Sequence, residues 1–139
     1  MGTPDFAVPS LEKLINTDGY DVVGVFTQPD KPKGRGYTLT PPPVKVCATE
    51  HNIPVYQPES MKNGEAMPIL EELNPDVIVV AAFGMLLKSD VLDFPKYGCM
   101  NVHGSILPKY RGAAPIQRAV IDGDEYSGVT IMQMGEGLD

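Results

Sequence analysis

Apolar residues recur along this chain with two different periods, one typical of helices and one typical of buried strands. Helical spacing links the apolar positions Phe6, Val8, Leu11, Leu14 and Ile15. This first pattern stops near Asp18-Gly19, a turn signal. Similar patterns predict helices over about 44–51, 65–73 and 115–122, and the second of these ends before Asn74-Pro75.

Strand patterns alternate with these helices. Val22 to Phe26 and Val77 to Ala82 are near-continuous runs rich in β-branched residues, as expected of parallel strands that are buried on both faces. Shorter extended segments are predicted over 53–56, 99–102 and 129–134. The alternation of strand and helix predicts an α/β fold with a doubly wound, mostly parallel sheet.

Composition narrows the class of protein. The chain has 139 residues, of which 42% are hydrophobic, and this suits one domain with a real core. No apolar run approaches the roughly 18 residues of a membrane span, and no signal-peptide pattern opens the chain. We therefore expect a cytoplasmic protein that does not contact a membrane. Cys47 and Cys99 form neither a CxxC motif nor a cluster with histidine, so we expect buried reduced thiols and no metal site.

A local basic segment interrupts an acidic chain. The formal net charge is -7, which argues against generic binding of nucleic acid. Residues 28–43 nevertheless carry Lys31, Lys33 and Arg35, with Lys45 shortly downstream, against one acidic residue, Asp30. Five prolines and the glycines beside Arg35 predict an exposed arm, flexible at its tip, that could contact phosphates. An ordinary solvated charged surface is the alternative.

Asn101 and His103 are the strongest candidates for chemistry. Asn101 lies in the predicted strand over 99–102, and His103 directly follows it. Because the two residues are two positions apart, both side chains should point to one face. Histidine exchanges protons near neutrality, with an unperturbed pKa of about 6.5, and an amide can donate a hydrogen bond to developing negative charge. With a carboxylate such as Asp139 in reach, the set suits acyl transfer. Alternatively, the two side chains satisfy local backbone groups, and the spacing alone does not decide.

A longer motif adds a family resemblance. The segment Asn101-Val-His103-Gly-Ser105-Ile-Leu-Pro108-Lys-Tyr-Arg111-Gly112 resembles the signature of the folate-dependent formyltransferases, and Asp139 matches their third catalytic position. Residues 1–9 and 28–36 resemble the methionyl-tRNA branch of that family; Ile106 and Tyr37 depart from its usual pattern. The resemblance implies a Rossmann-like fold and transfer of a formyl group, without a covalent enzyme intermediate or a metal. The implied donor is 10-formyltetrahydrofolate, and the implied acceptor is the α-amine of initiator methionyl-tRNA.

The same resemblance implies a role for particular residues. It implies catalytic roles for Asn101, His103 and Asp139. It implies a folate pocket formed by Phe83, Gly84, Met85, Leu87, Ser105, Ile106, Leu107 and Pro108. It implies tRNA contacts by Lys31, Lys33, Arg35 and Arg111. Taken from the residues alone, Met85 to Leu87 fit equally well as core at the start of a helix.

The ends of the chain bear on domain organisation. Met1-Gly-Thr-Pro4 resembles the turn that follows a first strand, and the sequence stops a few residues after a predicted strand. We therefore expect residues 1–139 to be an incomplete catalytic domain, without its first strand and without a carboxy-terminal domain. Initiator methionyl-tRNA and folate are the expected partners, with no obligate protein partner. Two alternatives stay open: a sibling enzyme acting on an amino sugar nucleotide or water, and a non-catalytic fragment that binds folate or RNA.

Overall fold

The computed structural model describes residues 1–36, 38–104 and 129–135. Its helical elements are a 3-10 turn η1 (Asp5–Ala7), α1 (Val8–Ile15), α2 (Pro43–Glu50), α3 (Met67–Leu73) and α4 (Ser89–Leu92). Its strands are β1 (Val25–Phe26), β2 (Lys31–Lys33), β3 (Thr38–Thr40), β4 (Val55–Tyr56), β5 (Ile78–Val80), β6 (Cys99–His103) and β7 (Thr130–Gln133). Three of the four predicted helices are confirmed, and the fourth, over 115–122, lies outside the described residues. The sequence did not predict α4.

The strands are mostly parallel and are joined through the first two residues of the chain. β1 pairs with β4 in parallel, β5 pairs with β6 in parallel, and β7 is antiparallel to β6. Gly2 donates its backbone N–H to the carbonyl of Phe26 at the end of β1 (3.0 Å). On the other side, Gly2 forms a parallel bridge with Ala81, just after β5. Residues 1–2 therefore complete one sheet in the order β4, β1, residues 1–2, β5, β6, β7.

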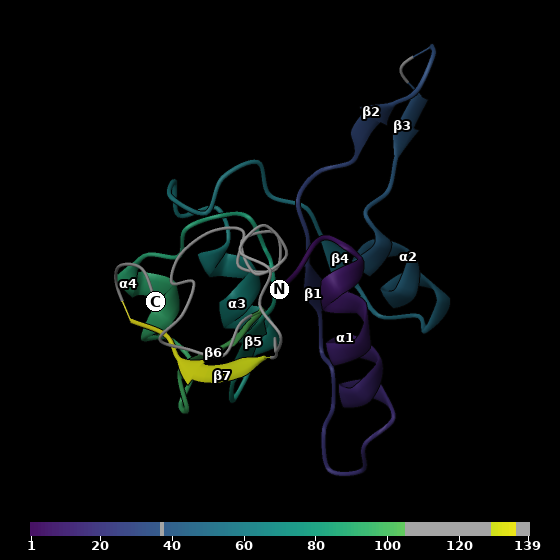
Figure 1. The fold of residues 1–139 in the computed structure, drawn as a ribbon. Coiled ribbons are helices and arrows are strands. Elements are labelled where there is room, and N and C mark those ends of the chain that lie inside the picture. Colours follow the sequence, from purple (N-terminus) through teal and green to yellow (C-terminus); the bar gives the residue numbers. More distant parts are fainter. Residues whose placement is uncertain (37, 105–128, 136–139) are drawn as a thin grey trace, which may run out of the picture.

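Both faces of this sheet are covered by helices (Figure 1). Phe26 packs in a core with α3 and α4, whereas its neighbour Val25 packs in a second core with α1 and α2. Val80 and Ala81 divide between the same two cores in the same way. Because consecutive residues of a strand point to opposite faces, the two cores lie on opposite sides of the sheet. The predicted doubly wound α/β fold is confirmed.

The two cysteines lie in these cores. Cys47 on α2 and Cys99 on β6 are both buried and free. Burial raises the pKa of the Cys99 thiol to about 11, so this thiol stays protonated at neutral pH. The expectation of buried reduced thiols is confirmed for both.

β1 and β5 are shorter than their apolar patterns predicted. Val22 to Gly24 and Val77 lie outside the paired strands and line a cavity of about 480 Å³ between the two runs. Of the described part of the chain, only residues 1–2 pair with the ends of both β1 and β5, and a strand needs a hydrogen-bonded neighbour along its whole length. The Met1 amine donates to the Val79 carbonyl (2.8 Å), and burial lowers its pKa to about 6. The predicted boundaries were therefore wrong for lack of a neighbouring strand.

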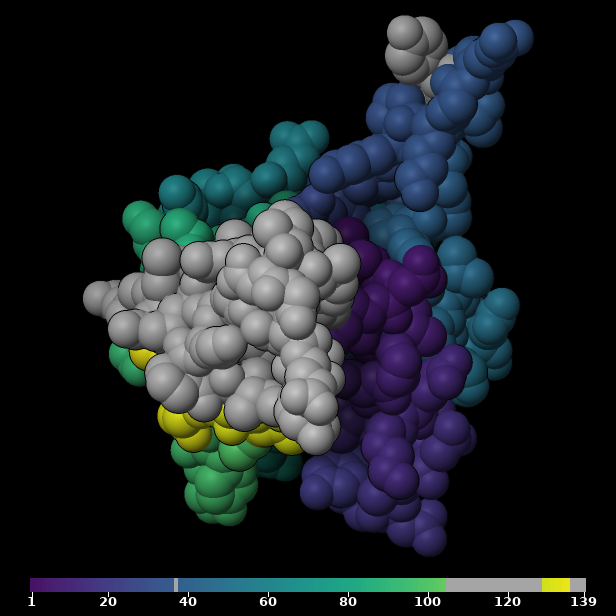
Figure 2. All heavy atoms as spheres, viewed as in Figure 1, coloured from purple at the N-terminus to yellow at the C-terminus, as the bar shows by residue number. Residues whose placement is uncertain are grey.

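The basic segment is a β-hairpin. The predicted exposed arm is confirmed, whereas its two strands were not predicted. β2 and β3 are antiparallel, with Lys31 opposite Thr40, Pro32 opposite Leu39 and Lys33 opposite Thr38. Gly34 and Gly36 have φ angles of +71° and +87°, which glycine adopts at little cost at the hairpin tip. The hairpin projects from the body of the molecule (Figures 1 and 2).

Candidate functional site

The carboxyl ends of the parallel strands meet at one edge of the sheet. Thr3 follows the Gly2 bridge, Gln28 follows β1 and Phe83 follows β5. The Thr3 hydroxyl donates to the Phe83 carbonyl (2.8 Å) and accepts from the Gln28 backbone N–H (3.3 Å). Thr3 thus ties together the segments that leave two different strands. Open parallel sheets place their ligands at this edge, which makes it the candidate site.

Asn101 and His103 lie at this edge on β6. Asn101 is opposite Val80 of β5 and Met132 of β7, and His103 is opposite Thr130. Cys99, two residues before Asn101, belongs to the core under α3 and α4, so the alternate positions Asn101 and His103 face that side. His103 is 5% exposed, and Asn101 is half-buried. The prediction that the two side chains share one face of a strand is confirmed.

The predicted folate loop follows β5 beside this pair. Gly84 has a φ of +84°, and a Cβ placed there would collide with the side-chain amide of Gln28. The positive φ favours glycine at this position, and the Gln28 side chain would have to move to admit a Cβ. Ala82, just before, also has a positive φ (+50°), which is uncommon for a residue with a Cβ and is found more often at functional sites. The loop is thus held in a particular conformation against the end of β1.

The side chains of this loop divide between core and surface. Phe83 and Leu87 belong to the core under α3 and α4, with exposed fractions of 2% and 9%. Met85 is half-buried against the same core, and Gly84 is exposed. Phe83 and Leu87 thus anchor the loop in the core. The alternative interpretation of Met85 to Leu87 as core at a helix start is confirmed for the burial of Leu87 and is wrong for Leu86, which is 62% exposed. Gly84 and Met85 are the two predicted folate residues that the loop leaves accessible.

The basic residues in and next to the hairpin differ in their exposure and contacts. Lys31, Lys33 and Arg35 are exposed, as the sequence predicted for a segment that could contact phosphates. Lys45 is different, because its Nζ lies 3.1 Å from both carboxylate oxygens of Asp30. Its charge is already paired within the protein. Lys45 therefore adds no unpaired charge to the basic segment, since α2 carries it back to the base of the hairpin.

Several predicted site residues lie outside the described residues: Ser105, Ile106, Leu107, Pro108, Arg111 and Asp139. Among the residues that are described, the site brings together Asn101 and His103 with the loop around Gly84, and the hairpin leaves from the same edge after β1. Within the described ranges, no group of three or more His, Cys, Asp or Glu residues could hold a metal ion, and no helix is long and apolar enough to cross a membrane.

Three polar residues at this edge were not among the site residues predicted from the sequence. Thr3 and Gln28 connect the loops after neighbouring strands, and Gln57 hydrogen bonds to Asp30 (2.7 Å). A usable signal was present for Gln57, because a polar residue directly after a predicted strand, here residues 53–56, lies at the ligand-binding edge of a parallel sheet. No comparable signal identifies Thr3, whose partners are 25 and 80 residues away in the sequence.

Comparison with known proteins relates the chain to one family. The formyl transferase family matches residues 1–139. The methionyl-tRNA formyltransferase of Hydrogenovibrio crunogenus is 60% identical over 99% of this chain and 44% of its own length. That of Marinobacter nauticus is 58% identical with the same coverage. The chain spans about 44% of the length of these curated relatives.

A solved structure supports the same fold. The phosphoribosylglycinamide formyltransferase of Bacillus halodurans superposes with a TM-score of 0.74 at 21% identity, over 99% of this chain and 71% of that protein. At this identity the likeness concerns the fold alone. The Rossmann-like α/β architecture that the sequence predicted is therefore also that of a solved formyltransferase.

Proposed function

Because the chain belongs to the formyl transferase family, we propose that it carries the catalytic part of a methionyl-tRNA formyltransferase. The reaction moves a formyl group from 10-formyltetrahydrofolate to the α-amine of methionine on initiator tRNA, for translation initiation. The observation that carries this proposal is the Asn101 and His103 pair on one strand face, beside a conformationally fixed glycine loop at the ligand edge of the sheet. The 60% identity to a protein named for this activity favours it over sibling activities.

The reaction chemistry suits these two side chains. The methionyl amine attacks the formyl carbon, a new C–N bond forms, and the carbonyl oxygen becomes an oxyanion. The Asn101 amide and an N–H of the His103 imidazole donate hydrogen bonds to that oxyanion. As the bond between the formyl carbon and the folate nitrogen breaks, the proton lost by the amine passes to that nitrogen. Asp139 helps to move this proton through water.

The formyl donor binds against the loop that follows β5. Phe83, Gly84, Met85 and Leu87 form one side of its pocket, together with the segment Ser105 to Pro108. Gly84 supports this assignment because the absence of a Cβ leaves backbone groups open to close approach. Met85 adds half-buried apolar surface, and the buried Phe83 and Leu87 keep the loop in place.

The acceptor tRNA contacts the hairpin. Lys31 and Lys33 on β2 and Arg35 at the tip are exposed cations on a projecting element, and they suit contacts with the phosphates of an acceptor stem. Arg111 adds a further cation next to the catalytic motif. Because phosphate contacts do not depend on base sequence, this surface positions the tRNA and leaves selection to other contacts.

Domain organisation and location follow from the same proposal. Residues 1–139 form part of a catalytic domain, and the cavity between β1 and β5 supports the expected first strand. An extended segment joined to Met1 would give the unpaired residues of both runs, Val22 to Gly24 and Val77, a hydrogen-bonded neighbour. A carboxy-terminal domain would lie in the remaining length of the curated relatives. Both substrates of the reaction place the protein in the bacterial cytoplasm.

The proposal is tested by where a labelled formyl group goes. The chain is incubated with 10-formyltetrahydrofolate carrying a labelled formyl group, together with methionyl initiator tRNA, an amino sugar nucleotide and water as competing acceptors. We expect label in formyl-methionine on tRNA. Label only in the sugar or in formate would support a sibling enzyme, and folate or RNA binding without turnover would support a non-catalytic fragment. Either result would contradict the proposed function of the chain.

A further inference from the structure

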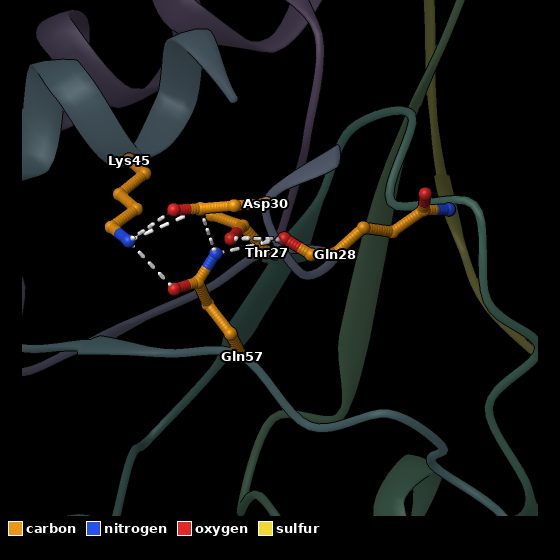
Figure 3. Close-up of polar contacts among 5 residues, drawn as sticks. All are labelled: Thr27, Gln28, Asp30, Lys45 and Gln57. Carbon is orange, nitrogen blue, oxygen red and sulfur yellow. Dashed lines mark hydrogen bonds and ion pairs between the residues drawn. The ribbon is translucent and has the colours of Figure 1, made fainter. Parts of the chain in front are cut away.

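Three side chains from separate elements meet at the base of the β2–β3 hairpin (Figure 3). Asp30 precedes β2, Lys45 lies on α2 and Gln57 follows β4. The Lys45 ammonium donates to both oxygens of Asp30 (3.1 Å each) and to Oε1 of Gln57 (2.9 Å). The Gln57 amide Nε2 donates to Oδ1 of Asp30 (2.7 Å). The three side chains thus form a closed ring of hydrogen bonds, which we call the hairpin clamp.

The hairpin clamp also binds the main chain where it leaves the sheet. Nε2 of Gln57 donates a second hydrogen bond, to the backbone carbonyl of Gln28 (3.1 Å). The Thr27 hydroxyl donates to that same carbonyl (2.9 Å). Together, the hydrogen bonds from Gln57 and Lys45 lower the pKa of the Asp30 carboxyl, so it is charged at neutral pH. The segment from Gln28 to Asp30 is therefore held by both its backbone and its side chain.

The clamp joins the two ends of the hairpin to each other and to the body. Asp30 lies directly before β2, the first strand of the hairpin. After β3, the second strand, the chain continues through Pro41 to Pro43 into α2, which carries Lys45. The described residues of β2, β3 and the tip are almost all exposed, and none of them belongs to either hydrophobic core. Core packing therefore does not fix the direction in which the hairpin projects. Among the described contacts at its base, the clamp has the geometry to do so.

We propose that Asp30, Lys45 and Gln57 are positioning residues that orient the basic hairpin toward the tRNA. This inference rests on the proposed function, because it assumes that Lys31, Lys33 and Arg35 bind tRNA. The clamp residues themselves need not touch RNA: Lys45 neutralises Asp30, and its side chain is 29% exposed against 26% for Asp30. Their contribution is to reduce the orientations that the hairpin would otherwise sample before binding.

The Asp30→Asn variant distinguishes a positioning role from a simple electrostatic effect, because the two predict opposite changes in tRNA affinity. Removal of one negative charge near a cationic hairpin would strengthen tRNA binding if charge alone mattered. If the clamp orients the hairpin, the same change weakens binding, by about three- to fivefold for a partly exposed pair. The measurement is the affinity of the 139-residue chain for initiator tRNA, by fluorescence anisotropy. Asp18→Asn, the same charge change at an exposed position after α1, is the matched control and should not weaken binding.

A second readout follows the hairpin itself. The ¹H–¹⁵N heteronuclear NOE of the hairpin amides should fall in Asp30→Asn and in Lys45→Met, and it should stay at the unchanged level in Lys45→Arg, which keeps the pair. Affinity for a folate analogue should be the same in all three variants, which excludes misfolding as the cause. Unchanged or tighter tRNA binding by Asp30→Asn, with the hairpin amides as ordered as before, overturns the proposal.

The hairpin cations provide the reference for this test. A variant with Lys31, Lys33 and Arg35 all replaced by glutamine should lose tRNA affinity whether or not the clamp matters. If that variant loses affinity and Asp30→Asn does not, only the positioning role is wrong. If the triple variant binds tRNA as tightly as the unchanged chain, the assigned RNA-binding surface is wrong, and the positioning role fails with it.

Discussion

Replacement of His103 by alanine is expected to lower the rate of formyl transfer by about 10²- to 10³-fold, the usual cost of losing one donor to a developing oxyanion. His103 lies at the end of β6, next to the strand that leads into the Gly84 loop, and its imidazole can also take part in proton transfer. The measurement is single-turnover formylation of methionyl-tRNA at saturating donor. Asn101→Ala should have an effect of similar size, because the amide shares the same oxyanion.

Two controls test whether the loss of turnover comes from the His103 imidazole itself. His51→Ala changes the other histidine of the chain, which is exposed after α2 and hydrogen bonds through Nδ1 to the Cys47 carbonyl; turnover should be unaffected. Because His103 is buried, thermal unfolding and affinity for a folate analogue must be measured in the same samples. Near-normal turnover in a folded His103→Ala variant would show that the imidazole takes no part in the chemistry.

The second large effect is expected on tRNA binding. Simultaneous replacement of Lys31, Lys33 and Arg35 by glutamine should weaken the affinity for initiator tRNA by about 10- to 100-fold near 0.1 M salt, because up to three phosphate contacts are lost. All three side chains are exposed on an element outside both cores, so the fold and folate binding should be preserved. The measurement is the dissociation constant as a function of salt concentration.

The salt dependence identifies the cause. The slope of log affinity against log salt should decrease in magnitude by about 2 to 3, close to one unit for each lost phosphate contact. Lys13→Gln, Lys62→Gln and Lys96→Gln together remove the same total charge from exposed positions elsewhere and should change the slope much less. Equal loss in both triple variants would mean that net charge, and not the hairpin, determines affinity.

The sequence predicted the positions of the strands better than their lengths. The apolar runs located β1 and β5, because a strand covered on both faces is apolar throughout, but β5 is confined to Ile78–Val80 within the predicted run Val77 to Ala82. β1 is shorter than its pattern, because pairing depends on a neighbouring strand, which the pattern of Val22 to Phe26 cannot reveal. Strand potential and strand pairing are thus different properties.

The hairpin was missed for the opposite reason. Six of its ten residues from Lys31 to Thr40 are charged, glycine or proline, and only Tyr37 and Leu39 are large and apolar, so no sustained apolar alternation marks both strands. The hydrogen bonds of the antiparallel pair and the clamp at the base hold it instead. That clamp joins residues up to 27 positions apart, and no local sequence pattern indicates that Lys45 pairs with Asp30 rather than with a ligand.

The placement of Asn101 and His103 on one strand face was predictable because it depends on one local rule. Residues two apart on a strand share a face, and this holds for Asn101 and His103 whatever surrounds them. The chemical meaning of the pair required more, since the same spacing occurs where polar side chains satisfy only the backbone. The fixed conformation of Gly84 and the ties made by Thr3 place a second ordered loop at the same edge, and these depend on contacts distant in sequence.

We propose that the edge containing Gly84, Asn101 and His103 binds the formyl donor. The most direct measurement is a titration of the ¹⁵N-labelled chain with a stable analogue of 10-formyltetrahydrofolate, followed by amide chemical shifts. We expect the largest changes in residues 83–87 and 101–103, saturating with one binding constant. Changes centred instead on the cavity between β1 and β5, around Val23 and Val77, or no saturable change at all, would contradict the account.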